Sequence, residues 1–383
     1  MAKGITLVGK SKSTVQFKRL KLVQFRNYHS EELSFSHRIV GIGGPNGAGK
    51  TSVLDAIHFL TVTRGLVSST DRSYVKKGTD FFRLEGGFYI EGEAYELAVK
   101  YQPGKGKTIE IDGEKVKKLS DYIGKFPVVS MIPQDIDNLL AGSRERRRVL
   151  DLGFSQIDKR YLDHLLVYRK LLRQRNAYLK ESLKNGQFET RMMDTFDERI
   201  APYARALFQL RTEYTAELGS YFNEFYREIS GGKEEISLEY QSQLAGGDYL
   251  DLVRKNRERD RVMGRSHVGL HKDDLAMSLL AEKLRDVASQ GQLKSGVLSL
   301  KLALHRLIVS HTQKQPVFLI DDLFDRLDEK RAGAFLRVTK EQTEGQIFIT
   351  DTNIKRLRQS VAGMNEKFTI FSIDKGKVLE VTD

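Results

Sequence analysis

The chain has no cysteine and no long apolar run. Without cysteine there is neither a disulfide framework nor a cysteine-ligated metal, which fits a reducing cytoplasm. No stretch approaches the roughly 20 apolar residues that a membrane-spanning helix needs. Residues 1–14 lack an apolar core, so we expect a loose leader rather than a signal peptide. We therefore expect a soluble, globular protein with a cytoplasmic location and no membrane partner.

Acidic residues are outnumbered in this chain. It carries 63 Lys and Arg against 51 Asp and Glu, which gives a net charge of +12. Such an excess favours a polyanionic partner, nucleic acid first. A merely soluble basic surface is the alternative. His267 and His271 have no third ligand at metal spacing, so a zinc site is not expected.

Residues 44–52 read G-P-N-G-A-G-K-T-S and match the phosphate-binding pattern G-x-x-x-x-G-K-[ST]. Residues 38–42 predict a buried strand before this loop, and apolar residues at helical spacing predict a helix after it. This order places a helix N-terminus where phosphate binds. Lys50 would reach the β- and γ-phosphates, and Thr51 would offer its hydroxyl to Mg²⁺. The alternative is a glycine turn that binds nothing. We predict that ATP or GTP contacts Gly44, Pro45, Asn46, Gly47, Ala48, Gly49, Lys50, Thr51 and Ser52.

Two adjacent carboxylates follow a second apolar strand, at residues 317–320. We expect Asp321 to hold Mg²⁺ as a Walker-B aspartate does, and Asp322 to orient the attacking water. N-capping of the next helix is the alternative for this pair. Gln134 stands where a Q-loop glutamine falls, so a catalytic contact with Mg²⁺ or the water is also expected.

Residues 288–292 read A-S-Q-G-Q and precede a helical pattern, in the place of the signature of ABC-type ATPases. In such heads the signature serves the nucleotide of the opposite subunit, so that two copies enclose two ATP molecules. A plain helix N-cap is the alternative for Ser289. Asp328 is the expected D-loop aspartate, and Thr350 or Asp351 is expected on the γ-phosphate side. The expected signature residues are Ser289, Gln290, Gly291 and Gln292.

The predicted secondary structure changes in kind twice along the chain. Short β-rich runs, including a meander at 84–111, are followed by a line of apolar residues at helical spacing that predicts long helices. A pattern of alternating strands and helices then follows. We therefore predict an α/β ABC/SMC-type ATPase head with mixed sheets and a P-loop, into which an antiparallel helix hairpin is inserted. The predicted parts are the N-terminal part of the head at 1–150, the helical arm at 151–260 and the C-terminal part of the head at 261–383.

Several runs in the same order resemble the RecF family of bacterial recombination-mediator ATPases, which are relatives of the SMC heads. The resemblance covers nearly the whole chain from about residue 17, and through its first run it adds Arg26 and Asn27 to the expected ATP-binding residues. The matching runs are F-R-N-Y at 25–28, the phosphate loop, R-R-R-V-L-D at 146–151, K-L-L-R-Q-R-N at 170–176, G-L-H-K-D-D-L at 269–275, S-Q-G-Q at 289–292, L-I-D-D at 319–322 and K-G-K at 375–377.

The resemblance implies a cytoplasmic DNA-repair protein that dimerises on ATP with Mg²⁺. It implies binding to single-stranded DNA and to the single-strand/double-strand junctions of gapped DNA. RecR and RecO are the implied partners in RecA loading, replication restart and SOS induction, and the implied ATPase is slow, DNA-stimulated and used as a switch. A transporter ATPase subunit, a different SMC-like head and an inert nucleotide-binding scaffold are the alternatives.

Basic residues crowd the predicted arm. Together with the net charge they favour a DNA-binding channel, although a solvated helix face is the alternative for each cluster. His271 and Asp273 are expected in a structural polar network. The DNA contacts are expected from Arg146, Arg147, Arg148, Arg169, Arg173 and Arg175.

Overall fold

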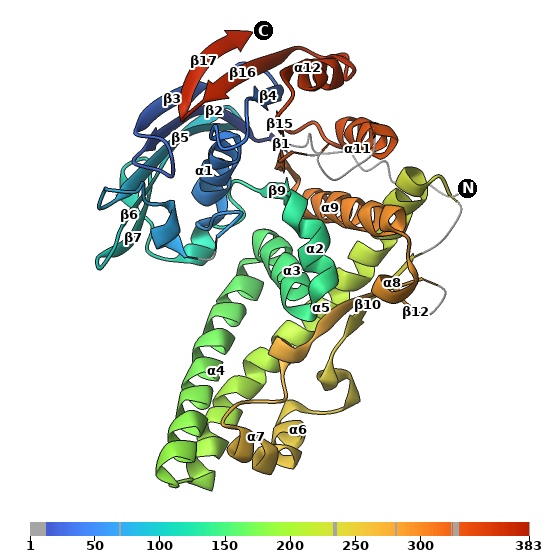
Figure 1. The fold of residues 1–383 in the computed structure, drawn as a ribbon. Coiled ribbons are helices and arrows are strands. Elements are labelled where there is room, and N and C mark those ends of the chain that lie inside the picture. Colours follow the sequence, from blue (N-terminus) through green and yellow to red (C-terminus); the bar gives the residue numbers. More distant parts are fainter. Residues whose placement is uncertain are drawn as a thin grey trace, which may run out of the picture. The chain divides into compact units, whose positions relative to one another are not determined.

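The computed structural model describes residues 13–68, 70–232, 236–279, 282–322, 324 and 329–382 (Figure 1). The chain divides into two compact units, one made of residues 1–133 and 305–383, the other of residues 134–304. The second unit thus begins before the predicted arm and ends after it. The difference arises because residues 134–150 before the predicted arm, and strands of a small sheet and the first part of a long helix after it, belong to this unit. Most of the expected leader, residues 1–12, lies outside the described residues.

A six-stranded sheet forms the centre of the first unit, in the order β17-β16-β4-β15-β14-β9. Neighbouring strands are parallel, except that β17 runs antiparallel to β16. Strands β4, β14 and β15 are buried throughout, as continuous apolar runs predict. The expected strands at 38–42 and 317–320 are confirmed. The strand bounds are β4 Ile39–Gly43, β9 Val128–Met131, β14 Val317–Ile320, β15 Ile347–Asp351, β16 Phe368–Asp374 and β17 Lys377–Thr382.

A second six-stranded sheet, in the order β3-β2-β5-β6-β7-β8, is antiparallel throughout. The predicted meander is confirmed, and Asp112 and Gly113, with φ of 51° and 81°, form its last turn. The strand bounds are β2 Gln16–Val23, β3 Ser30–Ser34, β5 Phe82–Ile90, β6 Glu93–Gln102, β7 Gly106–Ile111 and β8 Glu114–Lys115. A short parallel pair joins β1 Ser13–Thr14 to β13 Lys314–Gln315.

Helix α1, Lys50–Val62, contacts strands of both sheets and is buried along nearly its whole length. Aromatic rings pack between the sheets, where Phe17 of β2 and Phe35, just after β3, contact Phe348 of β15. Helix α12, Ile354–Ala362, covers β4, β15 and β16. Because α1 is anchored on both sheets, the loop that precedes it has a rigid base. Among the described residues, the other helices of this unit are η1 Asp71–Tyr74, η2 Leu119–Asp121, α11 Glu329–Gln342 and the last part of α9 Gln290–Thr312.

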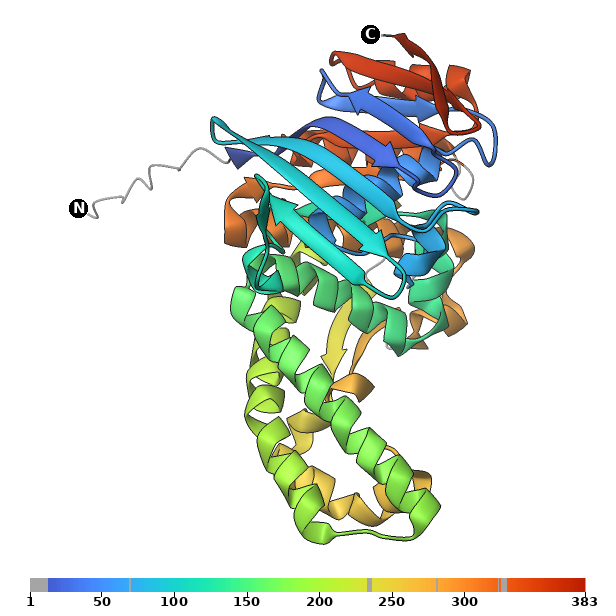
Figure 2. The same ribbon diagram turned by 90° about the vertical axis from the view of Figure 1, so that its left-hand side faces the viewer.

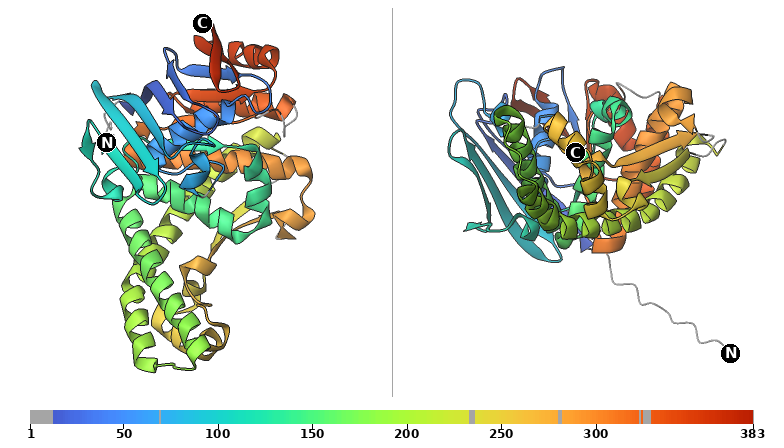
Figure 3. Two further views of the ribbon diagram at one scale, coloured as in Figure 1. Left: turned by 60° about the vertical axis from the view of Figure 1, so that its left-hand side comes forward. Right: turned by 90° about the horizontal axis from the view of Figure 1, so that it is seen from below.

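Two long helices dominate the second unit (Figure 2). Helix α4, Lys159–Asn185, ends at Gly186, which takes the left-handed conformation at φ 73°, and α5 covers Thr190–Ser230. The two helices lie side by side (Figure 3), so the predicted helix hairpin is confirmed. A small antiparallel sheet of β10 Ile236–Gln241, β11 Asp274–Leu279 and β12 Glu282–Lys283 completes the unit. Its other helices are α2 Pro133–Ala141, α3 Ser143–Ile157, η3 Gln243–Gly246, α6 Tyr249–Lys255, α7 Arg257–Met263, η4 Leu270–Lys272, α8 Leu284–Val287 and the first part of α9 Gln290–Thr312.

None of the helices in the described part of the chain has the length and apolar character needed to cross a lipid bilayer.

Candidate nucleotide site

The loop between β4 and α1 takes a conformation that depends on glycine. Gly44, Gly47 and Gly49 have φ of 153°, 77° and 122°, which other residues rarely adopt. A Cβ added at Gly44 would lie 2.1 Å from the carbonyl oxygen of Ile373, and one at Gly49 would lie 2.8 Å from Tyr28 Oη. The loop therefore wraps around the N-terminus of α1 with no side chain in the way, as a phosphate cradle requires.

The F-R-N-Y run braces this loop from the side. Asn27 Nδ2 donates to the carbonyl of Ala48 at 2.9 Å, and Tyr28 Oη donates to the carbonyl of Gly49 at 3.1 Å. Ser52 Oγ in turn donates to Asn27 Oδ1 at 3.2 Å. The N–H of Gly376, in the turn between β16 and β17, donates to the carbonyl of Ala48 at 2.8 Å. Much of the hydrogen-bonding capacity of Asn27 is thus used to hold the loop.

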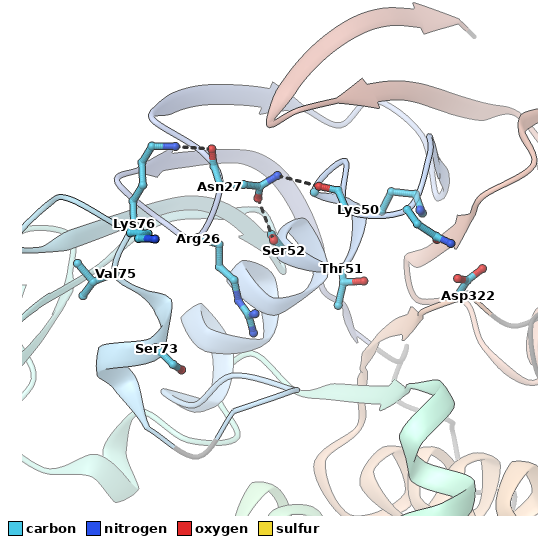
Figure 4. Close-up of a pocket in the computed structure, with 13 residues that line it drawn as sticks. Arg26, Asn27, Lys50, Thr51, Ser52, Ser73, Val75, Lys76 and Asp322 are labelled. Carbon is cyan, nitrogen blue, oxygen red and sulfur yellow. Dashed lines mark hydrogen bonds between the residues drawn. The ribbon is translucent and has the colours of Figure 1, made fainter.

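A cavity of about 630 Å³ opens in front of the loop (Figure 4). This volume is typical of a site for a small-molecule ligand. Most of the predicted ATP-binding residues line it: Arg26, Asn27, Asn46, Gly47, Gly49, Lys50, Thr51 and Ser52. The other three act through the loop backbone. Lys50 Nζ donates to the carbonyls of Gly44 and Pro45, at 2.9 and 3.1 Å, and Ala48 receives the bonds described above.

Sequence reasoning missed one wall of this cavity, which is formed by Ser73, Val75, Lys76 and Lys77. This segment reaches the site because Val75 forms an isolated antiparallel bridge with Phe25. Lys76 Nζ also donates to the carbonyl of Asn27 at 2.7 Å. Two adjacent lysines shortly after a phosphate-loop helix are the sequence signal that could have pointed to this wall.

Arg26 is fixed against the cavity by two contacts. Its Nη2 lies 2.9 Å from Asp55 Oδ2, and its guanidinium lies 4.5 Å from the centre of the Tyr74 ring. Asp55 is fully buried, and this burial raises the pKa of its carboxyl group. The guanidinium of Arg26, paired with Asp55, is therefore held in one place at the wall of a cavity that Lys50 also lines.

The two predicted acids lie beside the loop. Thr51 Oγ1 is 3.1 and 3.0 Å from the two carboxylate oxygens of Asp321, and Asp322 lines the cavity. Asp321 is only 6% exposed, and burial raises the pKa of its carboxyl group. A hydroxyl and a carboxylate at this distance are the hard oxygen donors that Mg²⁺ prefers, so the residues present fit the predicted metal.

Thr350 and Asp351, at the end of β15, were expected on the γ-phosphate side, but both have internal partners. Asp351 is buried and accepts two hydrogen bonds from Arg356, at 2.7 and 2.6 Å, so an internal cation neutralises its charge. Thr350 is buried too and contacts Asp321 and the backbone of Asp322. Neither residue is among those that line the cavity.

The predicted signature lies in the second unit, at the start of α9. Ser289 Oγ accepts the N–H of Gln292 at 3.3 Å, and Gln292 Oε1 accepts the N–H of Ser289 at 2.5 Å. These reciprocal bonds form a capping box, so the alternative of a helix N-cap is confirmed. Capping leaves Ser289 and Gln290 exposed, so a role toward a second subunit stays a prediction. Gln134, in α2, is exposed as well and its role is likewise a prediction, whereas Asp328 lies outside the described residues.

One predicted DNA contact is wrong. The Arg175 side chain has 0% exposure and lies between Asp197 and Asp260, with N–O distances of 2.7 Å to both. These ion pairs join α4, α5 and α7. A guanidinium enclosed in this way is not accessible to DNA phosphates.

The other five arginines of the arm fall into two groups. Arg146 makes a two-pronged pair with Asp274, at 2.7 and 2.8 Å, and Arg147 donates to the carbonyl of Asp273, so both hold α3 against the start of β11. Arg148 and Arg173 are exposed, with a side-chain exposure of 45% for Arg148. Arg169 is half-buried, and its Nη2 lies 2.6 Å from Asp151 Oδ2. The exposed group keeps the cations that an anionic polymer could contact.

The expected polar network around His271 and Asp273 is present. His271 Nε2 lies 3.1 Å from the carbonyl oxygen of Ser266, and Nδ1 lies 3.2 Å from Tyr168 Oη. Asp273 accepts hydrogen bonds from Arg211 at 2.6 Å and from Tyr240 at 2.5 Å. Both residues thus serve the internal structure of the second unit.

Comparisons with known proteins agree with this architecture. The family described as RecF/RecN/SMC N terminal domain matches residues 16–377. The DNA replication and repair protein RecF of Porphyromonas gingivalis is 37% identical over 363 residues, which cover 94% of this chain and 99% of the relative. The corresponding RecF of Parabacteroides distasonis is 35% identical over 361 residues, or 94% of this chain and 98% of the relative.

Solved structures show the same similarity. The recombination mediator protein RecF bound to ATP, described as part of the RecFOR pathway, superposes with a TM-score of 0.85 at 27% identity and covers 97% of this chain and 98% of that one. Its complex with ATPrS gives 0.84 at 28% identity, with coverage of 96% and 98%. An Smc head domain from Pyrococcus furiosus gives 0.52 at 15% identity, which shows a common fold alone.

Proposed function

Since the chain belongs to the RecF/RecN/SMC family, as a RecF-type DNA replication and repair protein with an SMC/ABC-type ATPase head, we propose that it is an ATP-dependent DNA-binding recombination mediator. In this proposal ATP with Mg²⁺ drives dimerisation, and the dimer binds single-stranded DNA and single-strand/double-strand junctions. Hydrolysis is slow, is stimulated by DNA and ends the bound state. The single observation that carries the proposal is the phosphate loop that shares one cavity with Asp322 and contacts Asp321 through Thr51.

Each residue of the site has a proposed task. Lys50 and the loop N–H groups bind the triphosphate, and Arg26 adds a fixed positive charge to the cavity wall. Thr51 and Asp321 hold Mg²⁺, which when bound neutralises charge on the phosphates. Asp322, at the edge of the cavity, orients the attacking water, and Gln134 is proposed to assist there.

Dimerisation is proposed to bring the signature of one subunit to the nucleotide of the other. Ser289, Gln290, Gly291 and Gln292 start a helix of 23 residues, and such an N-terminus attracts an anion. The capping box fixes the backbone there, and Ser289 stays exposed although its hydroxyl oxygen accepts the capping hydrogen bond. Asp328 is proposed to act in the same interface as the D-loop aspartate.

The DNA contacts are proposed to come from Arg148, Arg169 and Arg173, in a chain with a net charge of +12. Such phosphate contacts are independent of sequence and weaken with salt. RecR and RecO are proposed as partners because the similar solved proteins are described as mediators of the RecFOR pathway. RecA loading, replication restart and SOS induction in the cytoplasm are the proposed cellular roles.

ATP turnover with and without gapped DNA tests this function. We expect slow turnover by the wild-type chain that rises when gapped DNA is added. The Lys50→Met variant should fold normally and show no ATP turnover, either with or without gapped DNA. Turnover that ignores DNA, or that survives in Lys50→Met, would contradict the proposal, and an absence of turnover would favour the inert scaffold.

A further inference from the structure

Thr350, near the end of β15, contacts both acids that follow β14. Its Oγ1 lies 2.7 Å from Asp321 Oδ1 and 2.9 Å from the backbone nitrogen of Asp322. The residue is completely buried. One side chain thus touches the carboxylate assigned to the metal and the backbone of the residue assigned to the water.

The directions of these two bonds follow from elementary chemistry. A hydroxyl group has one hydrogen and two lone pairs, whereas a backbone N–H can only donate. The Asp322 N–H must therefore donate to the oxygen of Thr350. The single hydroxyl hydrogen is then free to point to Asp321, so Thr350 accepts from one acid residue and donates to the other.

The bond to Asp322 lies where the backbone ladder stops. Parallel pairing between β14 and β15 ends with Ile320 opposite Ile349. Asp322 then has a φ of 41°, a left-handed conformation that is uncommon for residues other than glycine. The side chain of Thr350 supplies the acceptor for the Asp322 N–H at this point, and the turn directs Asp322 to the cavity (Figure 4).

Thr51 also donates to Asp321, but its contact differs in kind. Thr51 lines the cavity and its oxygen is a proposed metal ligand, so its bond to Asp321 changes when Mg²⁺ binds. Thr350 does not line the cavity, and its contact can persist throughout the reaction. We propose that Thr350 is a positioning residue of the ATPase site, whose hydroxyl orients Asp321 for the metal and fixes Asp322 for the water. This inference rests on the function proposed above.

Loss of the hydroxyl would act on two groups at once. It would leave the Asp322 N–H without this acceptor, and it would remove a donor from a carboxylate that is already buried. Both effects concern the residues proposed to hold the metal and the water. The hydrogen bonds from Asn27 and Tyr28 that hold the phosphate loop do not involve Thr350.

Three variants test the inference. Thr350→Val keeps the shape of the side chain without the hydroxyl, and we expect kcat to fall roughly tenfold and half-saturating Mg²⁺ to rise roughly tenfold. Binding of ATP in excess EDTA should stay within about twofold of wild type. Thr350→Ser restores the hydroxyl and should restore both values to within roughly threefold. The control is Thr339→Val, since Thr339 is equally buried in the same unit but donates to the carbonyl of Phe335, and it should behave as wild type.

The inference is overturned if Thr350→Val keeps the Mg²⁺ requirement and kcat of the wild type. It is also overturned if Thr350→Ser is as impaired as Thr350→Val, because the role would then be packing. The Mg²⁺ titration of nucleotide binding needs no turnover. A wild type that does not hydrolyse ATP would therefore contradict the proposed function, while the shift in Mg²⁺ requirement still decides the role of Thr350.

Discussion

Arg175 and Asp260 form an ion pair in which neither side chain is exposed to solvent, with Nη1 2.7 Å from Oδ2. Arg175 Nε also donates to Asp197 Oδ1 at 2.7 Å, and Asp260 Oδ1 accepts the N–H of His267 at 2.9 Å. These contacts join three helices inside the second unit, where Arg257 Nη2 also lies 3.3 Å from Asp197 Oδ2. Arg173, two residues earlier on α4, is exposed, so the same helix carries one structural and one accessible arginine.

The first prediction uses this matched pair. Arg175→Met should lower the free energy of unfolding by about 3–5 kcal/mol, because it removes the guanidinium shared by two buried carboxylates, of which only Asp197 keeps a second arginine, Arg257. Arg173→Gln should change the free energy of unfolding by less than about 0.5 kcal/mol. It should reduce the slope of the logarithm of the DNA-binding constant against the logarithm of the salt concentration by about one. Urea unfolding and DNA titrations at several salt concentrations measure the two effects. A fully stable Arg175→Met protein would contradict the structural role.

The second prediction concerns Asp321 and pH. Metal binding needs the carboxylate form, and burial raises the pKa of this group above the ordinary value of about 3.9. Mg²⁺-dependent ATP binding should therefore weaken as pH falls, and should begin to do so at a higher pH than an exposed aspartate would give. Calorimetric titration at several pH values, with Mg²⁺ or EDTA, measures this. Asp321→Asn should remove the Mg²⁺ dependence, and a variant that keeps it would show that the metal is held elsewhere.

The third prediction separates the two roles of Ser289. Asn and Asp both cap helices as well as Ser does, so either substitution should preserve the start of α9. Ser289→Asp adds a negative charge where a partner's phosphate is proposed to bind, whereas Ser289→Asn does not. Light scattering with ATP should show a dimer for Ser289→Asn and a monomer for Ser289→Asp, with monomer ATP binding unchanged in both. An ATP-dependent dimer of Ser289→Asp would rule out the proposed contact with the partner.

The fourth prediction is a loss of stability in mild acid. Burial lowers the pKa of His271 to about 4, because the charged imidazolium loses its hydration inside the second unit, and the hydrogen bond to the carbonyl of Ser266 opposes this shift only in part. Between this value and the ordinary value of about 6.5, the unfolded chain binds a proton that the folded chain does not. The free energy of unfolding therefore decreases by up to about 3 kcal/mol as the pH is lowered through this range. Burial raises the pKa of nearby Asp273, and protonation of that group offsets part of the loss.

Urea unfolding at neutral and mildly acidic pH tests this prediction. His271→Gln should flatten the dependence on pH, whereas substitution of the exposed His29 by Gln should leave it unchanged. If wild type and His271→Gln lose stability in parallel as pH falls, another group is responsible.

Local patterns predicted the phosphate loop and its flanking strand and helix, because neighbours in sequence determine them. The acids after β14 were predictable for the same reason. The burial of Arg175 was not, because its partners lie 22 and 85 residues away and only the packing of α4 against α5 and α7 brings them together. The cavity wall at residues 73–77 likewise depends on a tertiary bridge, between Phe25 and Val75.

The central claim is that ATP joins two copies of the chain and that the joined form binds DNA. Sedimentation with labelled gapped DNA, in the presence of ATP, ADP or no nucleotide and at two salt concentrations, tests it most directly. With ATP we predict a dimer on the DNA, and with ADP, without nucleotide or in Lys50→Met we predict binding weakened by roughly tenfold or more. A monomer that binds this DNA equally well under all nucleotide conditions would contradict the account.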